Sequence, residues 1–412
     1  MVVLPSVKVL AMVLAGGRGE RLHPLTQYRS KPAVPFGGTY RLIDFVLSNL
    51  FNSGILHIYV LTQYKAHSLI RHLQQGWILT QPVDGAFIIP VPAQMQVGES
   101  WYQGTADAVY QNVALIKRMN PELVLVFGAD HVYTMDIRQM IEFHLEKDAD
   151  ITVATIPMPR SEASRFGVTV VDSEGRICEF KEKVKDPPAM PGNPDLSLVS
   201  MGNYVFKSEV LIEELELDSR DPESTHDFGR DILGKAIKRR KVYAYDFSTN
   251  RIPGTDGQGR YWRDVGTLRS YYEANMDLIK PLPQLNLYNP HWPIRSARYH
   301  DSPAKVVIGS EGQMGLVENS LLSPGVIISG AYVRNSIIGR NTRIWSRAVV
   351  EDSILLGETE VGEGAHIQRA IIDHGNSIPP GEKIGYDPER DRGKYFVDPS
   401  SGLVIIPRNP LY

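Results

Sequence analysis

The stretch Val9-Leu10-Ala11-Met12-Val13-Leu14-Ala15-Gly16-Gly17-Arg18-Gly19-Glu20-Arg21-Leu22 decides the fold of the first part of the chain. Its first six residues are aliphatic and end at a glycine-rich segment, which is typical of a buried strand in a parallel sheet. Glycines directly after a strand let backbone N–H groups approach phosphate oxygens. Arg21, together with Lys31 of Ser30-Lys31-Pro32, supplies charge that can hold a triphosphate. We therefore predict a first strand followed by a phosphate-binding loop.

The spacing of this loop separates it from two common phosphate-binding motifs. No Gly-Lys-Ser or Gly-Lys-Thr closes it, as a Walker A loop requires, and its glycines lack the dinucleotide-binding spacing. A glycine-rich loop alone favours a plain strand-to-helix turn with arginines in solvent. The complete string with its following Lys-Pro favours phosphate binding instead.

The first two-thirds of the chain alternate short apolar runs with amphipathic stretches, the pattern of a mostly parallel sheet flanked by helices. We expect strands at residues 9–14, 58–61, 124–127 and 151–155. Helical spacing of apolar residues predicts helices at residues 42–51, 66–74, 106–118 and 137–145. The predicted fold class is α/β, with a Rossmann-like first domain over residues 1–280.

Residues 281–303 are rich in proline, which neither a helix nor a central strand tolerates, so we expect a linker there. Beyond it, aliphatic residues recur with a period close to six. This period predicts a left-handed parallel β-helix over residues 304–412, and short antiparallel strands are the alternative. Coils of this kind readily pack against one another side by side, so the pattern also indicates an oligomer. The recurring residues, each expected to point into the coil, are Ile327, Val333, Ile338, Ile344, Val350, Val361 and Ile367.

The composition of the chain limits the kinds of partner that it can bind and the compartment in which we expect it. The chain has 412 residues, with 44 Lys plus Arg against 47 Asp plus Glu, so it has no electrostatic footprint for nucleic acid or an anionic membrane. The single cysteine, Cys178, excludes an internal disulfide framework and a cysteine zinc cluster. No stretch of about 20 uncharged apolar residues is present to span a bilayer, and the apolar N-terminus runs into Gly16 without a cleavage-like spacer. We expect a cytoplasmic protein.

Several longer motifs resemble the sugar-nucleotide pyrophosphorylases, and closely the glucose-1-phosphate adenylyltransferases, also called ADP-glucose pyrophosphorylases. The resemblance covers nearly the whole chain. The matching motifs include Lys31-Pro32-Ala33-Val34, Phe36-Gly37-Gly38, Arg41-Leu42-Ile43-Asp44-Phe45, Leu47-Ser48-Asn49, Asn52-Ser53-Gly54-Ile55, Trp101-Tyr102-Gln103-Gly104-Thr105-Ala106-Asp107-Ala108, Ser200-Met201-Gly202 and Tyr261-Trp262-Arg263-Asp264-Val265-Gly266-Thr267.

The resemblance implies a nucleotidyltransferase domain followed by a left-handed β-helix, usually in a homotetramer. It implies transfer of the adenylyl group of ATP to α-D-glucose 1-phosphate, which gives ADP-glucose and pyrophosphate for glycogen or other α-glucan synthesis. A sister pyrophosphorylase that uses UTP, dTTP or GTP is the nearest alternative, because base choice rests on few contacts. A non-catalytic regulatory subunit and a β-helix acyltransferase are further alternatives. Arg21, Lys31, Asp130, Lys183 and Asp264 together argue against the regulatory subunit.

Carried over position by position, the resemblance also implies the substrate contacts. Arg21 and Lys31 would hold the triphosphate, and the nucleotide would lie against Gly16, Gly17, Arg18, Gly19, Gln94 and Gly104. Glucose 1-phosphate would be bound by Tyr102, Gly167, Glu182, Lys183, Ser200, Tyr204 and Asp227. In Phe180-Lys181-Glu182-Lys183, strand alternation puts the two lysines on one face and cannot choose between them, whereas the family match selects Lys183. The family usually has proline where this chain has Val184.

Two aspartates are candidates for a metal site. Asp130 follows the strand expected at residues 124–127, and Asp264 lies in Trp262-Arg263-Asp264-Val265-Gly266. Two carboxylates from distant segments suit Mg²⁺, which can bridge the attacking and leaving phosphates. Asp130 alone reads more readily as a turn carboxylate, and the matching motif around Asp264 reverses that interpretation.

Two histidines, His131 and His226, invite a general-base interpretation that the chemistry does not require. The sugar phosphate is already an anionic nucleophile, so positioning and charge neutralisation suffice. We assign both histidines a structural role.

Regulation is a further implication of the resemblance. Arg29 and Arg41 match positions that bind an inhibitory nucleotide in some members, and basic side chains suit any phosphorylated effector. Gln63 and Trp101 match loop residues that relay activation, although a buried tryptophan beside Tyr102 is an equal alternative. Tyr28 and Pro35 depart from residues of the family's effector sites, so the effector is not named.

Overall fold

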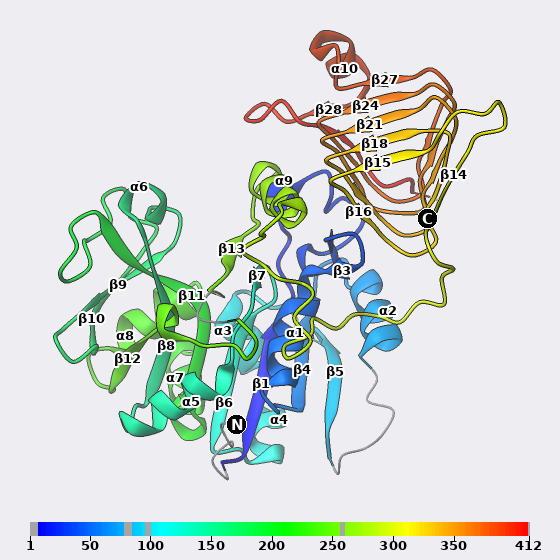
Figure 1. The fold of residues 1–412 in the computed structure, drawn as a ribbon. Coiled ribbons are helices and arrows are strands. Elements are labelled where there is room, and N and C mark those ends of the chain that lie inside the picture. The colour runs from blue at the N-terminus through cyan, green and yellow to red at the C-terminus, as the bar shows by residue number, and fades with distance from the viewer. Residues whose placement is uncertain (1–6, 78–84, 95–99, 256–259, 411–412) are drawn as a thin grey trace.

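The computed structural model describes residues 7–77, 85–94, 100–255 and 260–410, and it has two parts (Figure 1). The first part is an α/β domain built on β1, and the second is a coil of short strands that lies above it in the figure. The predicted fold class, a Rossmann-like domain followed by a left-handed parallel β-helix, is confirmed.

The central sheet of the α/β domain is parallel at its core. β1 (Val9–Leu14) pairs in parallel with β4 (His57–Thr62) on one side and with β6 (Leu123–Gly128) on the other. The strand order is β10-β9-β11-β6-β1-β4-β5, and β8 pairs with both β11 and β12. The pairs β6–β11, β11–β8, β11–β9 and β9–β10 are antiparallel, so the sheet is mixed toward one edge. The remaining strands are β5 (Phe87–Pro92), β8 (Ile151–Pro159), β9 (Gly167–Val171), β10 (Ile177–Glu182), β11 (Leu196–Lys207) and β12 (Val242–Asp246).

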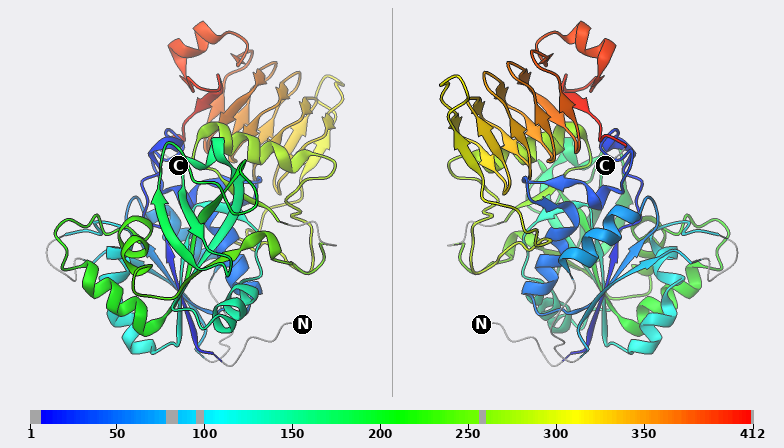
Figure 2. Two further views of the ribbon diagram at one scale, coloured as in Figure 1. Left: turned by 90° about the vertical axis from the view of Figure 1, so that its left-hand side faces the viewer. Right: turned by 90° about the vertical axis from the view of Figure 1, so that its right-hand side faces the viewer.

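Helices cover both faces of this sheet (Figure 2). Successive residues of a strand point to opposite faces, and β1 shows the result. Val9, Ala11 and Val13 pack with α1, α2 and α5, whereas Leu10 and Met12 pack with α3, α4 and α7. These helices are α1 (Leu42–Asn52), α2 (His67–Gly76), α3 (Thr105–Tyr110), α4 (Val113–Met119), α5 (Ile137–Glu146) and α7 (Ser208–Asp218).

Shorter elements complete the fold. Two strand pairs, β2 (Pro35–Phe36) with β3 (Tyr40–Arg41) and β7 (His131–Tyr133) with β13 (Trp262–Asp264), are antiparallel. The short helices are η1 (Glu20–Leu22), η2 (Lys31–Ala33), α6 (Arg160–Ala163), the π-helical η3 (Phe228–Leu233), α8 (Gly234–Ala236), η4 (Phe247–Thr249), α9 (Leu268–Met276), η5 (Asp277–Ile279) and α10 (Pro388–Lys394).

One predicted helix is wrong in its extent, because residues 106–118 form two helices rather than one. The break falls at Asn112, whose backbone is not helical (φ −111°, ψ 15°). Its side-chain amide donates to the carbonyl of Ala108 at 2.8 Å and to the hydroxyl of Tyr102 at 2.9 Å. A side chain that bonds to nearby backbone competes with the helix, and no apolar periodicity reports it.

The second part is a parallel β-helix with three sheets. Val333 pairs with Val350, Val350 with Ile367 and Ile367 with Ile384, so these coils take 17 residues each. The parallel pairs exclude the alternative of short antiparallel strands. The first side consists of β14 (Lys305–Val307), β17 (Ile327–Ser329), β20 (Arg343–Ile344), β23 (Glu360–Val361) and β26 (Ser377–Ile378). The second side consists of β15 (Leu316–Glu318), β18 (Tyr332–Arg334), β21 (Val349–Glu351), β24 (His366–Gln368) and β27 (Lys383–Ile384). The third side consists of β16 (Leu321–Leu322), β19 (Ile337–Ile338), β22 (Ile354–Leu355), β25 (Ala370–Ile372), β29 (Val404–Ile406) and β28 (Phe396–Val397).

The inward residue of β17 was predicted one position too early. Ile328 is buried and pairs with Ile344, whereas Ile327 is only partly buried. A strand of three residues has one inward position, so a one-residue shift exchanges its faces, and two adjacent isoleucines give no pattern to choose between them.

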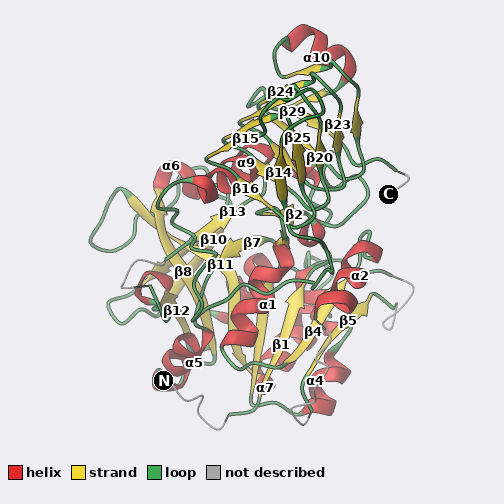
Figure 3. Cartoon of the chain, turned by 45° about the vertical axis from the view of Figure 1, so that its right-hand side comes forward, coloured by secondary structure: helices red, strands yellow, loops and turns green. Residues whose placement is uncertain are grey.

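The two parts share a hydrophobic core. Residues of η1, α1 and α9 pack against Ile337, Ile354 and Ile371 on one side of the β-helix (Figure 3). The hydroxyl of Tyr272 on α9 donates to the carbonyl of Asp352 at 2.6 Å. Arg29 and Asp373 form a buried ion pair, 2.8 Å apart, across the same boundary. Within the described ranges, no helix is long and apolar enough to cross a membrane.

Candidate functional site

A cavity of about 750 Å³ lies at the carboxyl ends of β1, β4 and β6, where Leu14, Leu61 and Gly128 line it. In open α/β sheets the carboxyl ends of parallel strands are where ligands bind. Most of the residues predicted for the substrates also line it, namely Gly16, Gly17, Arg18, Gly19, Arg21, Lys31, Tyr102, Gly104, Asp130, Gly167, Glu182, Lys183, Ser200, Tyr204 and Asp227.

The glycine-rich loop closes one side of the cavity. Gly19 has a left-handed backbone (φ 65°), and a Cβ atom there would lie only 2.7 Å from Cβ of Lys31. Glycine is therefore required at this position for its conformation and for its close approach to Lys31. The carbonyl of Gly19 accepts from the N–H of Leu22 and from the hydroxyl of Thr26, each at 3.0 Å. These bonds hold the loop in the turn that brings Arg21 to the cavity.

Lys31 joins the two aspartates predicted for a metal. Its ammonium group lies 2.9 Å from Asp130 Oδ2 and 3.5 Å from Asp264 Oδ1, and its side chain is buried. The pairing of β7 with β13 places Asp264 opposite His131, next to Asp130 in the chain. Burial would raise the pKa of the Asp130 carboxyl, but the charges of Lys31 and His131 and the hydrogen bond from Lys31 together hold that pKa well below its usual range. Asp130 is therefore an anion at neutral pH.

The residues present fit Mg²⁺ only if the phosphates of a bound substrate supply further ligands. Among the residues that the structure describes, no group of three or more His, Cys, Asp or Glu side chains could hold a metal ion. Mg²⁺ is usually bound by one or two carboxylates together with substrate phosphates and water. Asp130 and Asp264 provide those carboxylates beside the same ammonium group, and the glycine-rich loop lies next to them.

The opposite side of the cavity is built from β9, β10 and β11. Glu182 pairs with Gly167 in the antiparallel β10–β9 ladder. A Cβ atom on Gly167 would lie 2.8 Å from Glu182 Oε2, so glycine makes room for the carboxylate. Tyr204 stacks on Phe228 with ring centroids 5.7 Å apart, and burial raises the pKa of its hydroxyl well above the usual range. This wall thus combines a carboxylate, the Tyr204 hydroxyl and an aromatic face, a combination that suits a sugar.

Comparison with known proteins identifies the family. A family model described as nucleotidyl transferase matches residues 10–280, and one described as GlmU-like, C-terminal hexapeptide matches residues 302–406. The glucose-1-phosphate adenylyltransferase of Thermus thermophilus is 52% identical over 408 residues, covering 98% of this chain and 99% of the relative. The enzyme of the same name from Deinococcus deserti is 50% identical over 407 residues, covering 98% of each chain. That of Photobacterium profundum is 48% identical over 400 residues, covering 97% of this chain and 98% of the relative.

The chain belongs to the glucose-1-phosphate adenylyltransferase family. The resemblance stated from the motifs is thereby confirmed, and so is the prediction of a nucleotidyltransferase enzyme.

In this member of the adenylyltransferase family, Lys183 does not have the strand conformation that the alternation in residues 180–183 predicted. β10 ends at Glu182, and Lys183 has a left-handed backbone (φ 49°), so strand alternation stops before it. Its N–H donates to the carbonyl of Phe166 at 3.0 Å, and its ammonium group lies 3.1 Å from Glu182 Oε1. Lys183 consequently lines the cavity with Glu182, whereas Lys181 pairs with Glu179 at 3.2 Å. The two lysines thus have different surroundings, which alternation alone did not predict.

The wall next to the glycine-rich loop contains contacts that the motifs did not point to. Asn112 donates to the hydroxyl of Tyr102, and Gln63 donates to the carbonyl of Tyr102 at 3.3 Å. Thr105 and Arg165 also line the cavity and were not predicted as site residues. Thr105 bonds to a distant segment at Asp227 and Phe228, and Asn112 bonds to the nearby Tyr102 and Ala108. The sequence carries no periodic signal for either set of hydrogen bonds.

Five of the predicted site residues are not among the described residues that line the cavity, namely Gln94, Trp101, Arg29, Arg41 and Asp264. Trp101 is 55% exposed, so the alternative of a buried tryptophan beside Tyr102 is wrong. Arg29 is buried against Asp373, and Arg41 donates to the carbonyl of Ser68 at 2.9 Å. Gln63, by contrast, lines the cavity. Asp264 borders it through its contact with Lys31.

Proposed function

We propose that this chain transfers the adenylyl group of ATP to α-D-glucose 1-phosphate, giving ADP-glucose and pyrophosphate. The observation that carries the proposal is the single cavity in which a glycine-rich loop with Arg21 faces a wall with Glu182 and Lys183. The names of the relatives, glucose-1-phosphate adenylyltransferases, agree with this pair of substrates.

The chemistry is a displacement at the α-phosphorus of ATP. A phosphate oxygen of glucose 1-phosphate forms the new P–O bond, the bond between the α- and β-phosphates breaks, and pyrophosphate leaves with the electron pair. Because the nucleophile is already an anion, this chain contributes position and positive charge rather than a general base. We assign Arg21 and Lys31 to the triphosphate and Lys183 to the sugar phosphate. The two histidines keep structural roles.

We propose Asp130 and Asp264 as the carboxylates that hold Mg²⁺ once nucleotide is bound. The ion would neutralise charge on the phosphates. The ammonium group of Lys31 balances one of the two carboxylate charges, and its contacts of 2.9 and 3.5 Å support a site that also accepts a second cation. Family membership supports the same assignment.

The alternative classes are weakened by the residues that meet in the cavity. A non-catalytic regulatory subunit has no need for Arg21, Lys31, Asp130 and Lys183 around one space. We assign the nucleotide base to the wall around Gly104. A sister enzyme for UTP, dTTP or GTP remains the alternative that the activity measurement tests.

We also propose regulation by a phosphorylated effector at Arg29 and Arg41, with Gln63 and Trp101 as the relay to the cavity. One guanidinium nitrogen of Arg29, Nη1, is buried and has no hydrogen-bond partner within the described part of the chain. Burial lowers the pKa of Arg408, and Arg29 and Arg71 lower it further, so several cations lie near one another. An added phosphate group would relieve that repulsion. A rate that does not respond to any phosphorylated metabolite would contradict this assignment.

We further propose that the protein is a cytoplasmic homotetramer and that its product is used in the synthesis of glycogen or another α-glucan. Exposed apolar side chains near the first coil of the β-helix, Val306, Val307, Ile308, Met314 and Leu316, support contact between subunits there. Light scattering tests the assembly. Pyrophosphate release with each nucleoside triphosphate in the presence of glucose 1-phosphate tests the reaction itself.

A further inference from the structure

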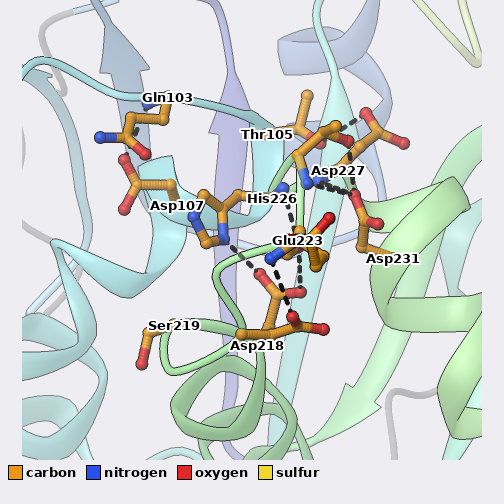
Figure 4. Close-up of polar contacts among 12 residues, drawn as sticks. Gln103, Thr105, Asp107, Asp218, Ser219, Glu223, His226, Asp227 and Asp231 are labelled. Carbon is orange, nitrogen blue, oxygen red and sulfur yellow. Dashed lines mark hydrogen bonds and ion pairs between the residues drawn. The ribbon is translucent and has the colours of Figure 1, made fainter.

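The two walls of the cavity are joined by a loop anchored on a buried carboxylate. Helix α7 ends at Asp218, whose side chain is only 4% exposed. Asp218 Oδ2 lies 2.7 Å from His226 Nδ1, and Asp218 Oδ1 accepts from the hydroxyl of Ser224 at 2.6 Å (Figure 4). A carboxylate only accepts hydrogen bonds, so Nδ1 of the imidazole is the donor. The ring of His226 is therefore tied to the end of α7.

A second carboxylate holds the backbone on either side of His226. Asp231 Oδ2 accepts from the N–H of Thr225 at 3.2 Å, from its hydroxyl at 2.6 Å and from the N–H of Asp227 at 3.1 Å. Between these bonds His226 adopts a left-handed backbone (φ 55°), which is uncommon for a residue other than glycine. The carboxylates of Asp218 and Asp231 thus hold a sharp turn in one conformation.

This turn belongs to one wall of the cavity and is hydrogen-bonded to the other. The carbonyl of His226 accepts from the N–H of Ala106 at 2.7 Å, at the start of α3. The hydroxyl of Thr105 donates to Asp227 Oδ2 and accepts from the N–H of Phe228, each at 3.0 Å (Figure 4). Three hydrogen bonds therefore join residues 105–106 to residues 226–228.

Close packing makes the junction rigid. A Cβ atom on Gly104 would overlap the carbonyl oxygen of His226 and lie 2.5 Å from that of Thr225. Gly104 and Thr105 line the cavity on one side of this junction, and Asp227 and Phe228 line it on the other. His226 itself is not among the described lining residues, so its effect on the substrates is exerted through the residues to which it is bonded.

We propose that His226, held by Asp218, is a positioning residue that couples the two substrate sites. The inference rests on the proposed assignment of Gly104 to the nucleotide and of Asp227 to the sugar. Because the turn bonds to both walls, a shift of Asp227 on sugar binding moves Gly104 and Thr105 with it. Each substrate then raises the affinity for the other, and the two factors are equal by thermodynamic linkage.

The test compares two substitutions of the same residue. His226→Gly removes the imidazole donor but accepts the positive φ, whereas His226→Asn keeps a side-chain N–H donor and also tolerates that backbone. Glu223→Gln, in the same loop, is the control for a change in charge. Asp218→Asn is a second, milder break of the pair, because the histidine and its backbone stay in place.

Calorimetric binding of glucose 1-phosphate, with and without α,β-methylene-ATP, gives the coupling factor, and the reverse titration must give the same factor. We expect a coupling of about 5-fold or more in the wild-type chain, Glu223→Gln and His226→Asn. We expect it to fall to within about 2-fold of unity in His226→Gly, and to fall in part in Asp218→Asn, with folding confirmed by circular dichroism. Unchanged coupling in both His226→Gly and Asp218→Asn, or no coupling in the wild-type chain, overturns the inference. A wild-type chain that binds neither compound overturns the proposed function instead.

Discussion

The ammonium group of Lys31 lies 2.9 Å from Asp130 Oδ2, and this ion pair joins the segment after the glycine-rich loop to the end of β6. The two residues are 99 positions apart in the chain. Asp264 lies 3.5 Å from the same ammonium group and comes from a third segment. The charges needed to handle phosphates thus converge where β1 and β6 end.

Asp130→Asn should remove most of the activity and leave the fold intact. The substitution deletes a charge at a strand end and fills the same volume, so core packing is unchanged. We expect kcat to fall by roughly 10²-fold or more, because electrostatic stabilisation of the transferring group is lost. Asp186→Asn, an exposed aspartate paired with Arg160, is the matched control. Near-normal kcat in Asp130→Asn would refute the metal assignment.

Lys183→Ala should raise the KM for glucose 1-phosphate and leave kcat and the KM for nucleotide nearly unchanged. A charge-assisted contact to phosphate contributes about 1.5 to 3 kcal/mol, which corresponds to a rise of roughly 10-fold to 150-fold. The contact exists in both ground and transition states, so the loss is mostly uniform binding. Lys181→Ala is the control, because Lys181 pairs with Glu179 and is not a described lining residue. Equal effects in the two variants would show the assignment to be wrong.

The pattern of apolar residues along the sequence predicted the core strand β1, whereas tertiary contacts determined the helix break at Asn112 and the register at Ile328. Residues 9–14 form β1 as predicted, because six aliphatic residues before glycines have few other places in an α/β fold. The break at Asn112 and the inward position of Ile328 depend on single side-chain contacts and on one residue of register. Periodicity cannot report either of them.

For the cavity, the limits of sequence reasoning are similar. Asp130 could be placed after a strand from the sequence, whereas its pairing with Lys31 depends on how three segments meet. The left-handed backbone of Lys183 ends the strand alternation that placed Lys181 and Lys183 on one face, whereas the family match had selected Lys183. The link from His226 to Ala106 is a backbone hydrogen bond, to which no side-chain pattern corresponds.

Stability should fall as the pH drops below about 6.5, because of His144. Burial and, to a smaller extent, the charge of Lys207 together lower the pKa of His144 from 6.5 to about 4. The unfolded chain therefore takes up a proton at a higher pH than the folded chain, and protonation favours unfolding. Linkage gives a loss of about 1.5 kcal/mol between about pH 6.5 and pH 5, and no further loss from this group below about pH 4.

His144→Asn removes this titration and retains an amide that can bond to the hydroxyl of Thr152, the partner of Nδ1 at 2.8 Å. Urea denaturation of both chains at several pH values measures the difference. We expect the variant to show a flatter pH dependence than the wild type over this range. Identical slopes would contradict a buried neutral histidine.

Truncation after Pro303 should give a poorly soluble protein that no longer assembles or responds to effectors. The cut uncovers the face on which Phe36, Leu42 and Tyr271 pack against the β-helix. It also leaves Arg29 without Asp373, its buried ion-pair partner at 2.8 Å. An exposed apolar face of this kind promotes aggregation. Size-exclusion chromatography measures the outcome, and a soluble, fully regulated monomer would exclude an assembly role for the β-helix.

The most direct test of the account is pyrophosphate release by the purified chain with glucose 1-phosphate, Mg²⁺ and each of ATP, UTP, dTTP and GTP in turn. We expect ATP to give the largest kcat/KM, by about 10²-fold or more over each of the other three, with ADP-glucose as the second product. A larger kcat/KM with UTP, dTTP or GTP would contradict the assignment of ATP. No pyrophosphate with any of the four would contradict catalysis by this chain.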